Sequence, residues 1–147
     1  METMRSIGSW MTALHVLAAL WFAAGVFSSS VVLAQVKRAK TSAERAFGVR
    51  LVARLMNVFI IPGALVAGAL GFYLVTGLHY GFGPFWVKAS IVVYLLVLAA
   101  ILFYQAPHIR KSAETGDAIG KGPAMLTHLV ALAIVVMVIL MAMKPVP

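Results

Sequence analysis

The sequence lacks cysteine and has few acidic residues. Without cysteine, disulfides, thiolate metal sites and cysteine nucleophiles are excluded. The four acids, Glu2, Glu44, Glu114 and Asp117, all lie outside the long apolar runs. No carboxylate is therefore available inside an apolar helix for acid–base chemistry. The chain also has no glycine-rich phosphate loop and no long internal repeat.

Polar residues are too scarce for a soluble domain. Hydrophobic residues make up 63% of the 147 residues and charged residues 11%, which is too little polar surface to cover a globular protein. Four apolar runs, at about 10–34, 51–76, 84–104 and 124–143, are each long enough to cross a bilayer as a helix. We therefore predict an all-α integral membrane four-helix bundle, with residues 1–147 forming a single membrane domain.

The basic residues indicate how these helices are oriented. Six lie from Lys37 to Arg54 and three from Arg110 to Lys121, and stretches rich in Lys and Arg stay in the cytoplasm. This pattern predicts a multi-pass protein of the cytoplasmic membrane with both termini on the outer side. It also accounts for the net charge of +8 without a nucleic-acid partner. A cleavable signal peptide fits less well, because the first apolar run is long and its positive charge follows it.

The second apolar run contains features that predict its packing. Pro62 should bend the helix, since its ring removes a backbone hydrogen bond. Gly63, Ala67 and Gly71 are spaced by four residues and form a groove of small side chains that allows another helix to approach closely. Asn57 is expected to make an interhelical hydrogen bond.

Aromatic residues follow this run, at the connection to the third helix. Tyr80, Phe82, Phe85 and Trp86 are typical of the belt that anchors a helix at a membrane surface.

His15 is an ionisable residue within the first apolar run. A polar group in hydrocarbon without a partner costs several kcal/mol, so an intramembrane histidine indicates a functional site. The helical face through His15 includes the small residues Ala18 and Gly25, which leave room for a flat group. Two interpretations remain open at this point: His15 binds a cofactor, or it donates a hydrogen bond to a neighbouring helix.

Eight methionines raise the question of copper. Met137 and Met141 lie one turn apart in the last run, but methionine also fills apolar cores, and neither cysteine nor a paired histidine accompanies them. The composition therefore favours a packing role.

Several short motifs together resemble a known group of membrane proteins. They are Ala13-Leu14-His15-x-x-Ala18-x-x-Trp21-Phe22-Ala23, Pro62, Gly71, Trp86-Val87-Lys88 and Lys144-Pro145. This pattern resembles the HemJ-type protoporphyrinogen IX oxidases, and it is similar to the membrane domain of CopD-type copper proteins and to related uncharacterised four-helix bacterial membrane proteins. The resemblance implies haem b as cofactor, His15 as an axial ligand of the haem iron, and a role for Lys88 at the cofactor. A cation near the interface can pair with a haem propionate.

The chain departs from the HemJ pattern at the start of its last helix. The HemJ-type proteins have an Asn-Glu pair with an Arg just before it, whereas this chain has Thr127-His128 and Ala124. The departure removes a proton acceptor. We therefore expect the scaffold without the ordinary oxidase activity.

Depth in the membrane separates the histidines. His15 and Lys88 both lie near the outer edge, whereas His128 lies near the inner edge, some 15 Å or more away across a core of about 30 Å. One iron cannot bind both histidines. We expect His15 to hold a first haem whose second axial position is open or filled by a residue such as Met141, with His128 serving a separate second site or none.

Two classes of function remain. In the first, the chain is a haem b protein of redox chemistry or haem handling, with a quinone or another membrane redox partner. In the second, it is a non-catalytic subunit or a transport-associated protein, copper transport included, whose bundle packs against a partner. In both cases we expect a homo-oligomer or a subunit of a larger complex in the lipid bilayer.

Overall fold

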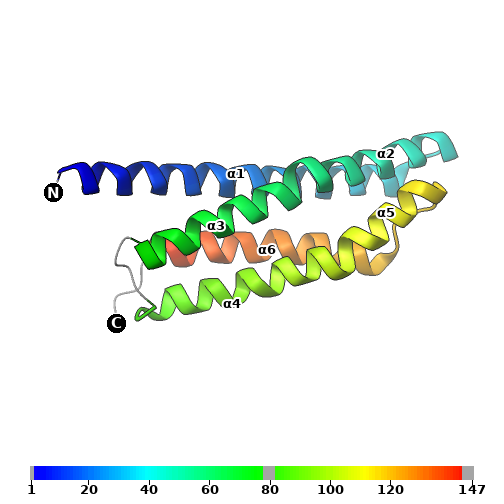
Figure 1. Cartoon of the computed structure of the whole chain (residues 1–147). Coiled ribbons are helices and arrows are strands. Elements are labelled where there is room, and N and C mark those ends of the chain that lie inside the picture. Colours follow the sequence, from blue (N-terminus) through cyan, green and yellow to red (C-terminus); the bar gives the residue numbers. More distant parts are fainter. Residues whose placement is uncertain (1, 78–81, 144–147) are drawn as a thin grey trace.

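A computed structural model describes residues 2–77 and 82–143, and every regular element in this part of the chain is a helix (Figure 1). Four helical rods pack side by side with alternating direction. The elements in chain order are α1 (Glu2–Arg38), α2 (Ser42–Leu55), the π-helical turn η1 (Met56–Ile60), α3 (Ile61–Gly77), α4 (Phe85–Ala99), the π-helical turn η2 (Ala100–Gln105), α5 (Ala106–Thr115) and α6 (Lys121–Met143).

The predicted all-α architecture is confirmed in its coarse form. The described chain has four helices long and apolar enough to cross a membrane, at Ile7–Arg38, Ser42–Gly77, Phe85–Thr115 and Lys121–Ala142. In each, only 22–33% of the most apolar window is buried inside the bundle. Most of the remaining apolar surface therefore points outward, which is compatible with contact with lipid.

The helices are longer than the sequence analysis predicts. The expected polar loops at 35–50 and 105–123 are mostly helical, and residues 39–41 and 116–120 are what remains of them. A capping box starts α2, since Thr41 Oγ1 accepts from the backbone N–H of Glu44 at 3.2 Å and Glu44 Oε2 accepts from the N–H of Thr41 at 3.4 Å. Gly116, with φ of 75°, ends α5. These local signals extend the helices past the apolar runs.

Each π-helical turn ends two residues before a proline. η1 precedes Pro62 and η2 precedes Pro107. A proline removes one backbone hydrogen bond and crowds the carbonyl four residues earlier, and a π turn at that place relieves the crowding. The helices therefore continue through both prolines.

The groove of small residues brings α3 directly against α1. A Cβ added to Gly63 would lie 2.8 Å from both Cα and N of Phe22, and one added to Gly25 would lie 2.6 Å from Cβ of Phe59. Ala67 is buried in the same groove. The prediction of a close helix approach at Gly63 and Ala67 is confirmed, and α1 is the partner.

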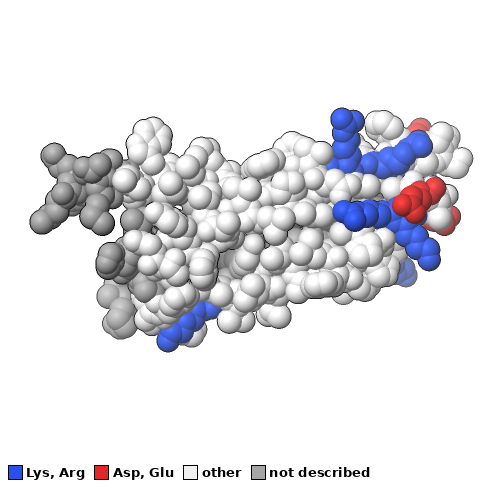
Figure 2. All heavy atoms as spheres, in the orientation of Figure 1, with Lys and Arg blue, Asp and Glu red and all other residues white. Residues whose placement is uncertain are grey.

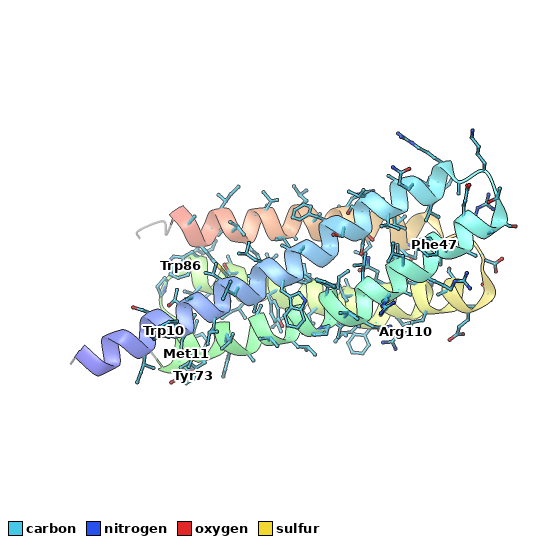
Figure 3. The ribbon with its side chains drawn as sticks, turned by 90° about the horizontal axis from the view of Figure 1, so that it is seen from above. Trp10, Met11, Phe47, Tyr73, Trp86 and Arg110 are labelled. Carbon is cyan, nitrogen blue, oxygen red and sulfur yellow. The ribbon has the colours of Figure 1, made fainter. Side chains whose placement is uncertain are left out.

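The two ends of the bundle differ in chemistry. Most Lys and Arg side chains gather at the end formed by α2 and α5, together with Glu44, Glu114 and Asp117 (Figure 2). Trp10, Tyr73 and Trp86 lie at the opposite end from Arg110 (Figure 3). We call these the basic end and the aromatic end. Tyr80, which the sequence assigns to an aromatic belt, lies outside the described residues, as does the Lys144-Pro145 pair.

The most completely buried side chains lie toward the basic end or at mid-bundle. The largest side chains with less than 2% exposure all lie in that half or at mid-bundle: Met56, Ile60, Ile101, Ile109, Val26, Val49, Val52, Thr127 and Ser29. In the aromatic half, the buried residues Ala67, Leu74 and Met137 retain 7–9% exposure. The half that contains His15 also has more completely buried residues, such as Val87 at 2% and Ala18 at 5%.

Candidate functional site

His15 lies on α1 and points to α3. Its Nδ1 lies 2.9 Å from the carbonyl oxygen of Ala67. Because a carbonyl can only accept, Nδ1 carries the hydrogen and donates it, which leaves Nε2 of the neutral ring with a free lone pair. Among the described residues, no hydrogen bond engages Nε2. The predicted hydrogen bond to a neighbouring helix is therefore present, and it still leaves one nitrogen able to bind a metal.

Gly71 makes room for the imidazole. A Cβ added at this position would lie 3.0 Å from Cε1 and 3.4 Å from Nδ1 of His15. The ring thus lies against the bare backbone of α3, with Ala67 one turn away. The four-residue spacing of small residues serves both the close approach of α1 and the seating of His15.

Contacts between helices show which residues share the level of His15. Tyr94 Oη on α4 donates to the carbonyl of Ala64 on α3 at 2.9 Å. Because α3 and α4 are antiparallel, Ser90, one turn before Tyr94, lies about one turn of α3 beyond Ala64, at the level where His15 meets Ala67 and Gly71. Ser90 is 5% exposed, and its Oγ has no hydrogen-bond partner in the structure.

The methionines of α6 flank the same level. Gln105 contacts Thr127 and Tyr104 contacts Gly122, so an antiparallel α6 reaches the level of Ser90 within its last two turns. Met137 is 9% exposed and belongs to the core, whereas Met141, which the sequence analysis proposes as a second ligand, is 36% exposed. The difference in burial therefore favours Met137 as the methionine that can reach a buried group.

Lys88 does not share the buried side of its helix. It lies in the first turn of α4 and is exposed, whereas its neighbours Val87 and Ser90 are buried. The structure thus brings Lys88 to the aromatic end of the bundle, as its place in the sequence predicts, but on the outside. From there a long side chain can reach along the helix to the membrane surface.

His128 lies far from His15 and faces outward. It is exposed on α6, nine residues before Met137, which is about 14 Å along the helix axis. Its neighbour Thr127 is buried, with Oγ1 accepting from Gln105 Nε2 at 2.6 Å and donating to the Pro123 carbonyl at 3.1 Å. The Thr127-His128 pair is therefore split between the core and the outer surface.

Two further polar features lie toward the basic end. Arg110 donates to Asn57 Oδ1 at 2.9 Å, which confirms the interhelical hydrogen bond predicted for Asn57. Ser29 is 1% exposed, and its Oγ has no partner in the structure. Ser29 shares the helical face of His15 by periodicity. Ser90 and Gln105 could not be predicted, because a serine or glutamine in an apolar run carries no sign of which helix it faces.

The structure offers no cluster of conventional metal ligands. In residues 2–77 and 82–143 no group of three or more His, Cys, Asp or Glu side chains could hold a metal ion. A metal at His15 would need most of its ligands from another group, as the porphyrin nitrogens provide for haem iron.

Comparisons with known proteins add no constraint on this site. No protein-family model, no curated protein and no solved structure matches the chain. The site is therefore argued from its own geometry.

Proposed function

We propose that this chain is a haem b-binding membrane protein in which His15 ligates the iron. One observation carries the proposal: the Nδ1–H of His15 is held by the Ala67 carbonyl at 2.9 Å. Histidines that bind metal commonly donate their second nitrogen to a carbonyl or carboxylate, which fixes the ring and its tautomer. Nε2 is the nitrogen left to bind iron.

The side chains at the level of His15 are of kinds that can contact a porphyrin. Ser90 supplies a buried hydroxyl without a partner at the same level, and Met137 supplies a buried thioether. Met137 is the preferred second axial ligand, ahead of the Met141 of the sequence analysis. Lys88 is exposed on the outside of α4, and in this proposal its long side chain would reach a propionate at the aromatic end.

The residues of the chain have distinct tasks in this proposal. The Ala67 carbonyl orients His15, and the backbone at Gly71 leaves the space that the ring occupies. The apolar wall would exclude water and so lower the polarity around the bound group, which influences its redox potential. When bound, haem b would supply one-electron chemistry, with a quinone or another membrane component as the partner.

The absorbance spectrum of the full chain tests the proposal. Protein purified in mild detergent from cells that make haem should show a Soret band that shifts on reduction with dithionite, at about one haem per chain. A colourless protein that stays colourless after incubation with haem would contradict it. That outcome would favour the second class of function, a non-catalytic or transport-associated subunit.

We further propose that the basic end faces the cytoplasm, because Lys and Arg concentrate there (Figure 2). Reporter tags at either terminus should then be active outside the cytoplasmic membrane. Tags inserted at residues 39–41 or 116–120, the short connections at the basic end, should be active inside. A terminal tag that reports from the cytoplasm would reverse the assignment.

The chain is not expected to work as a protoporphyrinogen IX oxidase of the HemJ type. His128 is exposed, and the hydroxyl of Thr127 is hydrogen-bonded to Gln105 and Pro123. Neither residue therefore replaces the carboxylate that would accept a proton in the core. Expression in a strain that lacks this oxidase should leave haem synthesis unrestored, with a HemJ-type protein as positive control. Growth equal to that control would show that the missing acidic pair is dispensable.

A further inference from the structure

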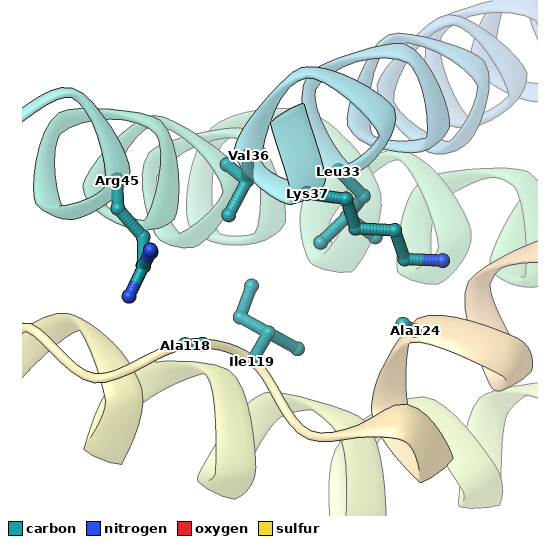
Figure 4. A pocket seen from close by; sticks show the side chains of 7 residues that line it. All are labelled: Leu33, Val36, Lys37, Arg45, Ala118, Ile119 and Ala124. Atoms are coloured by element: carbon teal, nitrogen blue, oxygen red, sulfur yellow. The ribbon is translucent and has the colours of Figure 1, made fainter. Parts of the chain in front are cut away.

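A cavity of about 180 Å³ opens at the basic end, away from His15 (Figure 4). It lies among the last turns of α1, the first turns of α2, the connection before α6 and the start of α6. Leu33, Val36 and Ile119 give it apolar walls, together with two alanines, and Lys37 and Arg45 are its charged lining residues. A small apolar hollow at a membrane end thus carries two positive charges.

Neither cation is neutralised by the protein. In the described part of the chain, Lys37 and Arg45 make no hydrogen bond or ion pair with their side chains, and no acid lines the cavity. The nearest carboxylate in sequence, Glu44, is engaged in the cap of α2, where Oε2 accepts from the backbone N–H groups of Lys40 at 3.0 Å and Thr41 at 3.4 Å. Two unpaired cations beside apolar walls favour a ligand that is both anionic and apolar.

The size and position of the cavity further restrict the kind of ligand that can bind. Its volume of about 180 Å³ suits a phosphate with a few adjoining carbons. Leu33 belongs to the apolar span, whereas Lys37 lies in the basic last turn of α1. The cavity therefore lies at the level where hydrocarbon meets lipid headgroups.

We propose that this cavity binds the headgroup phosphate of an anionic phospholipid. The charged ends of Lys37 and Arg45 lie on opposite sides of Ile119 (Figure 4), and these long side chains would turn toward the phosphate. Leu33, Val36 and Ile119 would contact the glycerol and the first acyl carbons. Basic pockets between membrane helices bind anionic headgroups in this way. A lipid held there would tie α1 and α2 to the connection before α6. The proposal does not depend on haem binding at the opposite end.

Lipid retention measured by native mass spectrometry tests it. The full-length protein, delipidated in neutral detergent, would be titrated with phosphatidylglycerol, with phosphatidylcholine, or with inorganic phosphate as the free-anion arm. We expect one phosphatidylglycerol to bind more tightly than any phosphatidylcholine. The Lys37→Gln/Arg45→Gln variant should lose about thirtyfold in this affinity, at about fivefold for each basic residue.

A matched variant separates a site from general attraction. Arg38→Gln/Lys40→Gln removes the same charge from neighbouring residues that do not line the cavity, and should keep the affinity within about threefold. Equal losses in the two double variants, equal binding of phosphatidylcholine, or saturation of the site by inorganic phosphate that displaces the lipid would each overturn the proposal. Lys37→Arg/Arg45→Lys, which keeps both charges, should bind nearly as the wild type does and guards against a folding defect.

Discussion

Replacing His15 with alanine is expected to remove haem b from the purified protein. The change deletes the imidazole whose Nδ1–H is held by the Ala67 carbonyl, and with it the nitrogen proposed to bind iron. Loss of an outer partner alone typically lowers metal-site affinity by about 10–100-fold, so loss of the ligand itself should lower the haem content by at least that factor. The measurement is haem per chain by pyridine haemochrome in matched preparations.

His128→Ala is the matched control for this result. His128 is exposed, nine residues before Met137 along α6, and lies at a different level from His15. The variant should keep the haem content and the reduced spectrum of the wild type. Loss of haem in His128→Ala with retention in His15→Ala would place the site at the basic end and contradict the proposed ligand.

Gly63→Ala should destabilise the bundle strongly. The new methyl group would meet Cα and N of Phe22 at 2.8 Å, and because these atoms belong to the backbone of α1, the two helices must separate. Overpacking of this kind costs about 1–3 kcal/mol. The free energy of unfolding, from reversible denaturation in mixed micelles of dodecyl sulfate, should fall by that amount.

Gly83→Ala serves as the control for Gly63→Ala. A Cβ at Gly83 has no atom within 4 Å, so this variant should unfold as the wild type does. Equal stability of the two variants would mean that α1 and α3 pack less closely than the structure shows.

The packing of α1 on α3 could be predicted in part from the sequence, and the reasons are local. The spacing of Gly63, Ala67 and Gly71 marks a small-residue face without knowledge of any partner. The face of α1 that includes His15 and Gly25 was also visible from helical periodicity. What the sequence could not supply was the register between these two faces, which places His15 against Ala67 and Gly71.

The helix boundaries show where apolar content misleads. The first apolar run ends near Ala34 and the second begins near Leu51, but α1 continues to Arg38 and α2 begins at Ser42. Beyond the apolar runs, helix formation depends on capping and helix propensity. The π-helical turns had no sequence signal other than the prolines that follow them. They arise because the chain keeps its helical course through residues that an ordinary α-helix would exclude.

The remaining members of the candidate site depend on contacts that join distant parts of the chain. The contact of Tyr94 with Ala64 shows that Ser90 lies at the same level as His15. No pattern in the sequence of α4 predicts that contact. Met137 and Met141 looked equivalent by spacing, and exposures of 9% and 36% separate them. Likewise Thr127 is buried and His128 is exposed, although the two are adjacent in sequence.

The most direct test of the central claim is the spectrum of a chain that keeps His15 as its single histidine. The sequence has four histidines, and His79→Gln, His108→Gln and His128→Gln together leave His15 alone. We predict that this variant, purified from haem-producing cells, shows the same Soret shift on reduction and the same haem content per chain as the wild type. A folded variant without haem, beside a wild type that contains it, would show that another histidine holds the iron and would contradict the assignment of His15.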